Sequence, residues 1–155
     1  GTPDDPSDFL PLLRGWQAAA GRNFHPDACG QMGLNGRAAA EAGKLVTVPG
    51  DLDTLMAGLA CGEPSLLAWQ ELERGAYAFI SLPDESAVEC MKLLARRTPP
   101  VVAGESAVAG LAGLLLAAQE PYARAALGLG PDSRVLLFGT EGATDPEVYA
   151  KLVQG

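Results

Sequence analysis

The chain has 155 residues, of which 48% are hydrophobic and 19% charged, and its formal net charge is −8. A chain of this length fits one domain and can bury a proper core. The negative charge argues against unassisted nucleic-acid binding and against adhesion to an acidic membrane surface, because both need clustered Lys and Arg. The longest apolar run, residues 108–118, is about half of what a transmembrane helix needs. No signal-like segment opens the sequence, so we expect a cytoplasmic protein.

The cysteines and the histidine predict no metal site. Cys29, Cys61 and Cys90 lack any metal-ligand spacing. A sparse, odd number of cysteines favours reduced and buried thiols, although the sequence leaves a Cys29–Cys61 bridge open. His25 is the only histidine, and its Pro- and Asp-containing surroundings are typical of a loop, which favours a histidine without a catalytic role.

The first elements in chain order are helices and irregular stretches. Ser7 is an N-cap candidate for a helix that runs to Gly21. After an irregular stretch, a helix is expected over residues 37–42 and a short strand over residues 44–48. The intervening run from Gly30 to Gly36 has a glycine at every third position, which could expose N–H groups to a phosphate. It matches no known phosphate loop, so a plain loop is the favoured interpretation.

The rest of the chain alternates helix-like and strand-like patterns. Asp84 is the predicted N-cap of an amphipathic helix. Residues 134–138 are apolar without alternation, which is typical of a buried strand in a parallel sheet. This alternation predicts an α/β fold, with a mainly parallel sheet and helices on both faces. Further helices are expected to begin at Asp53 or Thr54, at Pro64, at Glu105 and at Asp145–Pro146. Further strands are expected over residues 76–82 and 101–103. In the helix that Asp84 caps, the residues expected to face the core are Val88, Met91, Leu94 and Ala95.

Three stretches rich in small and apolar residues share one character, and we expect them to converge on one site. They are residues 52–64, 104–110 and 136–145. In parallel α/β sheets, ligands bind beyond the carboxyl ends of strands. The segment 139–142 follows the last expected strand, and Glu105 opens a helix directly after another expected strand. Both therefore lie where a ligand would bind.

The expected helix over residues 105–119 carries a stripe with almost no side-chain bulk. The stripe would let either a packed strand or a flat ring approach closely, and the sequence favours packing over a ring. Its members are Ser106, Gly110, Gly113 and Ala117.

From Ala38 onward the sequence resembles the C-terminal part of the diaminopropionate ammonia-lyase family. That family belongs to fold type II of the pyridoxal-phosphate enzymes, the tryptophan-synthase-like group. The resemblance lies in PGDLDTLMAGLACGEP at 49–64, GESAVAG at 104–110 and TEGATD at 140–145. It implies an α/β region over residues 37–155, resembling the C-terminal part of such a lyase. An N-terminal helix and irregular segment over residues 1–36 has no assigned role.

The resemblance implies α,β-elimination of diaminopropionate, a small amino acid, to pyruvate and ammonia. Pyridoxal phosphate would be the cofactor and serve as the electron sink. Glu105 and Ser106 would lie beside the cofactor ring, and Gly139 and Thr140 would face its pyridine nitrogen. These four residues are the predicted cofactor-binding residues, and no catalytic residue is identified.

The lysines depart from the family pattern. Such enzymes form a Schiff base with a lysine in an N-terminal Ser-x-Lys motif, and Lys44, Lys92 and Lys151 have no such context. The chain is therefore part of a full lyase, one piece of a split enzyme, or a non-catalytic α/β binding or interaction domain derived from that fold. In the first two cases we expect no activity without the N-terminal half. We also expect homo-oligomers or a complementing N-terminal lyase chain, because half of a larger fold exposes apolar surface.

Overall fold

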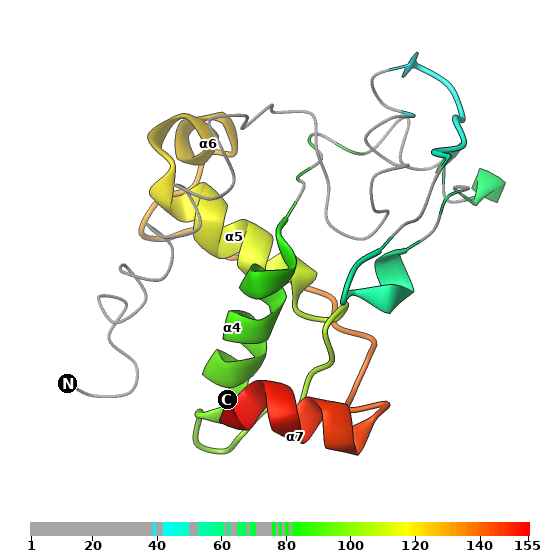
Figure 1. Ribbon diagram of the computed structural model, residues 1–155. Helices are drawn as coiled ribbons and strands as arrows, with labels where there is room; N and C mark the ends of the chain where they lie inside the picture. The colour runs from blue at the N-terminus through cyan, green and yellow to red at the C-terminus, as the bar shows by residue number, and fades with distance from the viewer. Residues whose placement is uncertain are drawn as a thin grey trace.

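The computed structural model describes residues 39, 42–49, 53–60, 62, 65–67, 69–70, 76, 78, 80 and 82–155. The predictions for the helix from Ser7, His25, the Gly30–Gly36 run, Cys29 and Cys61 lie outside these residues. None of the described helices is long and apolar enough to cross a membrane. In chain order the described elements are the short 3₁₀ helix η2 (Ala57–Leu59) and the helices α4 (Asp84–Ala95), α5 (Ala109–Gln119), α6 (Pro121–Ala126) and α7 (Pro146–Gln154), as Figure 1 shows.

Helix α4 begins at Asp84, as predicted, but the predicted role of that residue was wrong. Pro83 occupies the N-cap and Asp84 is the first helical residue. The Asp84 carboxylate instead accepts a hydrogen bond from Thr54 Oγ1 at 2.5 Å and another from the Leu55 backbone N–H at 2.6 Å. The acidic side chain at the start of α4 therefore ties a segment 30 residues earlier to the helix, while its charge still favours the positive end of the helix dipole.

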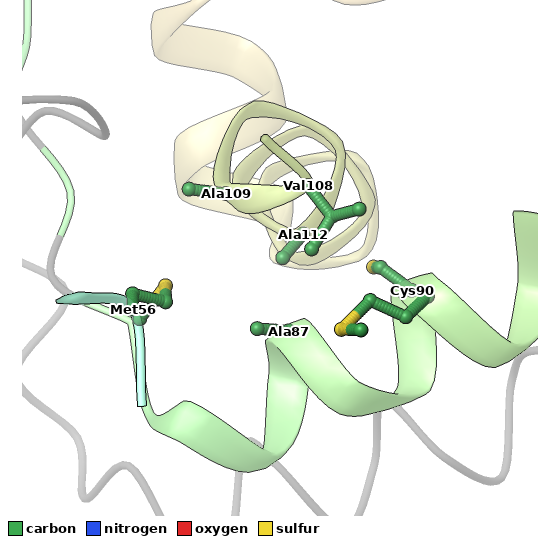
Figure 2. Close-up of a cluster of buried hydrophobic side chains, with 7 residues drawn as sticks. Met56, Ala87, Cys90, Val108, Ala109 and Ala112 are labelled. Atoms are coloured by element: carbon green, nitrogen blue, oxygen red, sulfur yellow. The ribbon is translucent and has the colours of Figure 1, made fainter. Parts of the chain in front are cut away.

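The core lies where α4 meets α5 and α7. Helix α4 packs against both of them, and Figure 1 shows it between α5 and α7. Small side chains at the interface, such as Ala87 and Ala112, let the helix backbones approach closely. Tyr149, Leu152 and Val153 of α7 pack against the same core. Its buried residues are Met56, Ala87, Cys90, Met91, Val108, Ala109 and Ala112, and Figure 2 shows the α4 and α5 side chains facing one another with Met56 beside them.

The periodicity of α4 predicted only part of its buried face. Met91 is fully buried and Leu94 packs against the core, so both predictions are confirmed. Val88 and Ala95 are half-buried. Ser86 and Cys90 are buried as well and were missed. Ser86 satisfies its hydroxyl by donating to the Pro83 carbonyl at 2.6 Å, which removes the penalty of burying a polar group.

Cys90 is a free, buried thiol. Burial raises the pKa of Cys90 to about 12, and the neighbouring Glu89 carboxylate adds to the shift. Because the thiolate is the reactive form, this side chain acts as a small hydrophobe of the core. The expectation of reduced, buried thiols is confirmed for this residue.

Helix α5 starts later than predicted. Residues 105–108 form turns, so the expected helix start at Glu105 was wrong, and Ser106 lies before the helix. The glycines of the small-residue stripe accept apolar side chains. A Cβ on Gly110 would lie 3.5 Å from Leu137 Cδ2, and one on Gly113 would lie 3.7 Å from Ile80 Cδ1. The stripe therefore serves packing at these two positions, as the sequence favoured.

The N-termini of helices α6 and α7 follow ordinary capping rules. The Glu120 carboxylate accepts from the Ala123 N–H at 2.6 Å, and Pro121 opens α6. This combination of cap and N1 proline signals a helix start, yet α6 was missed. Helix α7 was predicted correctly, because the Asp145 carboxylate caps it and Pro146 is its first residue.

The first of the three small-residue stretches does not form the α-helix expected from Asp53 or Thr54. Its described residues contain only η2, and no side chain caps that element. The Thr54 hydroxyl, a candidate cap, accepts from the Met56 N–H at 3.1 Å and donates to Asp84, but no α-helix follows it. The helix expected from Pro64 is seen in part, since residues 66–67 and 69–70 are helical and Trp69 is buried.

No described residue lies in a β-strand, so the parallel sheet is not confirmed. The segment 134–138 is exposed, with Leu136 at 77% and Phe138 at 65% of full exposure, and the prediction of a buried strand there was wrong. A strand that is apolar on both faces needs a covering layer on both faces. Here Leu137 packs against Gly110 of α5, while Leu136 and Phe138 are open to solvent.

Candidate functional site

Three segments far apart in the sequence meet beside the start of α5. The Gly58 N–H donates to Ser106 Oγ at 3.1 Å, and the Ser106 N–H donates to Glu141 Oε2 at 2.8 Å. The Gly104 N–H donates to the Glu141 carbonyl at 3.1 Å. These bonds connect the three small-residue stretches, so their predicted convergence is confirmed for the described residues.

The segments touch at glycines, most closely at Gly104. A Cβ on Gly104 would lie 2.5 Å from the Gly142 carbonyl oxygen and 2.7 Å from Glu141 Oε2. A Cβ on Gly58 would lie 2.8 Å from Ser106 Oγ, and one on Gly139 would lie 3.3 Å from the Ala107 carbonyl oxygen. The small residues that marked these stretches in the sequence therefore allow backbones to approach closely.

The predicted site residues occupy this junction to different degrees. Ser106 lies at its centre, bonded on both sides. Glu105 precedes it in the same turn and is half-buried. Gly139 backs onto the Ala107 carbonyl. Thr140 is exposed and immediately precedes Glu141.

Three further residues of the junction were missed, although each lies within a stretch that the sequence singled out. Gly58 and Gly104 are sites of close approach, and Glu141 bonds through both its side chain and its carbonyl. The signal that could have found them is a glycine or a carboxylate inside an otherwise small and apolar run. Such a residue indicates a close contact or a buried bond.

Among the described residues, none accepts the Ser106 hydroxyl proton. A serine hydroxyl has one donor and two acceptor positions. Ser106 Oγ accepts from Gly58, which leaves its proton to donate elsewhere. This half-buried hydroxyl can therefore donate to an acceptor atom that enters the junction.

No lysine contributes to the junction among the described residues. Lys92 Nζ pairs with Glu89 at 3.5 Å on α4. Lys151 lies in the last turn of α7 and Lys44 in an exposed turn. In the described part of the chain, no group of three or more His, Cys, Asp or Glu side chains could hold a metal ion.

Comparison with known proteins identifies the family of this chain. A sequence profile of the family described as pyridoxal-phosphate dependent enzyme matches residues 26–140, which include Gly58, Ser106 and Thr140. The chain belongs to this family. Its cofactor, by this resemblance, is pyridoxal phosphate.

The relatives found are diaminopropionate ammonia-lyases. The chain is 39% identical to that of Escherichia coli strain K12 over 117 residues, which are 72% of this chain and 29% of the relative. It is 40% identical to that of Salmonella typhimurium strain LT2 over 114 residues, 68% of this chain and 28% of the relative. The chain thus spans less than a third of these relatives.

A solved structure agrees with the sequence comparison. The Escherichia coli enzyme, in complex with an aminoacrylate-PLP azomethine reaction intermediate, superposes with a TM-score of 0.69 at 32% identity, covering 81% of this chain and 33% of that one. This neighbour is a fold type II enzyme of the pyridoxal-phosphate group, as the sequence predicted. The resemblance to diaminopropionate ammonia-lyase is therefore confirmed.

Replacing Gly104 by alanine tests the close contact at the junction. We expect Gly104→Ala to lower the free energy of unfolding by about 1–3 kcal/mol, because the new methyl group meets a backbone oxygen that has little freedom to move. Gly130→Ala is the matched control, since a Cβ there has no heavy atom within 4 Å. Urea unfolding measures both. Equal stability of the two variants would show that the segments do not meet as described.

Proposed function

We propose that this chain forms one wall of the active site of a pyridoxal-phosphate dependent ammonia-lyase. The complete enzyme would convert diaminopropionate to pyruvate and ammonia by α,β-elimination. The observation that carries the proposal is the junction of Gly58, Ser106 and Glu141, in a chain 39% identical over 117 residues to a diaminopropionate ammonia-lyase.

The described residues suit one wall of such a pocket. Ser106 offers a hydroxyl whose oxygen accepts from the Gly58 N–H and whose own backbone N–H is held by Glu141. Thr140 offers a second hydroxyl on the adjoining segment, close to the pyridine nitrogen in this proposal. Gly139, packed against the Ala107 carbonyl, leaves that segment without side-chain bulk. When bound, pyridoxal phosphate supplies an electron sink, and the protein supplies orientation and electrostatics.

The lysines of this chain do not match the Schiff-base lysine of the family. A lyase of this kind needs a lysine beside the cofactor. None of Lys44, Lys92 and Lys151 stands in a Ser-x-Lys motif, and Lys92 pairs with Glu89 on α4. We infer that the lysine comes from a complementing N-terminal lyase portion. This chain would then hold and orient the cofactor ring without catalysing a step alone.

An exposed apolar face supports the requirement for a partner. Leu136 and Phe138 are more than half exposed, and so is Val102. Leu137 of the same segment packs against α5, whereas its two neighbours keep most of their surface exposed. Exposed apolar clusters of this kind mark interaction surfaces. We infer that the N-terminal lyase portion covers this face, with a second copy of the chain as the competing occupant.

The cytoplasmic location stays a prediction.

A non-catalytic interaction domain is the second candidate function. The same exposed face and the lysine pattern favour it, because binding through an apolar surface needs no Schiff-base lysine. It differs from the first proposal in requiring no cofactor.

Mixing the chain with the N-terminal portion of the Escherichia coli diaminopropionate ammonia-lyase and pyridoxal phosphate separates these functions. We expect ammonia release from diaminopropionate only when both polypeptides are present. Borohydride should then trap the cofactor on a lysine of the N-terminal portion, located by peptide mass spectrometry. Ser106→Ala should lower kcat/KM roughly tenfold, the cost of one lost hydrogen bond at the site.

Ser133→Ala is the matched control, because Ser133 Oγ also accepts from a glycine N–H, that of Gly130 at 2.9 Å, but in an exposed surface turn. Trapping on Lys44, Lys92 or Lys151 with ammonia release by the chain alone would contradict the need for a partner. Association without cofactor binding would favour the interaction domain.

The exposed face makes a separate prediction about assembly. In sedimentation velocity we expect the chain to associate, with itself or with the N-terminal lyase portion. Leu136→Asp should weaken that association at least tenfold by placing a charge in an apolar contact. Tyr122→Asp is the control, since Tyr122 is also exposed but belongs to another element, helix α6. A chain that stays monomeric at high concentration, alone and in the mixture, would count against the proposal.

A further inference from the structure

Glu141 contacts the turn before α5 at two points. Its backbone carbonyl accepts from the Gly104 N–H at 3.1 Å, and its carboxylate accepts from the Ser106 N–H at 2.8 Å. The two bonds lie on either side of Glu105. A single residue thus holds both ends of the stretch that carries two predicted site residues.

The fit between Glu141 and this turn is close. The Glu141 side chain lies over Gly104, where a Cβ would be 2.7 Å from both Glu141 Cγ and Oε2. Gly104 is buried and Glu141 is half-buried, so water competes poorly for the carboxylate. A hydrogen bond from a backbone N–H to an ionised carboxylate is stronger than one between neutral groups. The contact is therefore both sterically matched and charge-assisted.

These bonds fix the orientation of Ser106. Its N–H is held by Glu141 and its Oγ by the Gly58 N–H. With the backbone held on one side and the hydroxyl oxygen on the other, the side-chain rotamer is restricted. The direction in which the hydroxyl proton can donate therefore depends on the position of the Glu141 carboxylate.

We propose that Glu141 is a positioning residue that holds the Gly104–Ser106 turn, and with it the Ser106 hydroxyl, in the geometry the candidate site requires. The importance of this geometry for cofactor binding rests on the proposed function. The hydrogen-bonded geometry itself does not.

The test compares Glu141→Gln with Glu141→Asp in the full, ¹⁵N-labelled chain. Glutamine keeps an acceptor oxygen at the same reach without the charge, whereas aspartate keeps the charge but is one methylene shorter. Hydrogen exchange of the Ser106 amide should rise about two- to threefold in Glu141→Gln, which loses only the charge assistance, and about tenfold or more in Glu141→Asp, which loses the reach. Glu147→Gln, which removes an exposed charge on α7, should leave the Ser106 amide unchanged. Equal exchange in both Glu141 variants would overturn the proposal.

A second readout separates positioning from a merely structural role. In the mixture with the N-terminal lyase portion, the dissociation constant for pyridoxal phosphate should rise about tenfold in Glu141→Asp and recover in Glu141→Gln. Unchanged cofactor affinity in Glu141→Asp, with faster Ser106 exchange, would overturn the positioning role. If the wild-type mixture binds no pyridoxal phosphate, the proposed function fails, and the Ser106 exchange rates alone decide whether Glu141 holds the turn.

Discussion

The contact between Glu141 and the turn before α5 is the constraint on which the candidate site depends. One carboxylate and one carbonyl of the same residue bind the N–H groups of Ser106 and Gly104. The contact closes a loop of 35 residues that contains α5 and α6. Closing such a loop costs chain entropy, so the contact persists only because the intervening helices pack. The site is therefore a consequence of the helical core as well as of its own hydrogen bonds.

The core and the junction share structural elements. Val108 and Ala109 are buried in the cluster between α4 and α5, two and three residues after Ser106. On the other side, the Asp84 carboxylate holds Thr54 and Leu55 against the start of α4, which places Met56 in the core and Gly58 beside Ser106. Rigid elements of this kind hold a functional group more precisely than a free loop does. A carboxylate at the start of a helix thus contributes to the geometry of a serine hydroxyl in another segment.

The sequence predicted what depends on local chemistry. The Asp145–Pro146 helix start follows from capping, and the convergence of the three stretches followed from shared small residues and a family resemblance. The Asp84 cap failed because a tertiary partner, Thr54, competes for the carboxylate, and no local pattern reveals such a partner. Helix α5 begins only at Ala109 because residues 105–108 form turns, in which the Ala107 and Ala109 N–H groups donate to carbonyls three residues earlier.

The strand expected at residues 134–138 shows a different limit. Its pattern is that of a segment covered on both faces, yet Leu136 and Phe138 are exposed in the structure. A sequence pattern shows how much burial a segment is suited to. Whether the segment reaches that burial depends on the layers that the chain itself contains. This mismatch is the observation behind the proposed partner, and the solved neighbour is about three times longer than the matched region.

Nuclear Overhauser effects across the junction test the central claim most directly. We expect cross-peaks between the Gly58 amide proton and the Ser106 β-protons, and between the Ser106 amide proton and the Glu141 γ-protons. Contacts between the Ala87 and Ala112 methyl groups would show that the α4–α5 core is intact in the same sample. If the core contacts are present and both junction contacts are missing, the three segments do not form a common site.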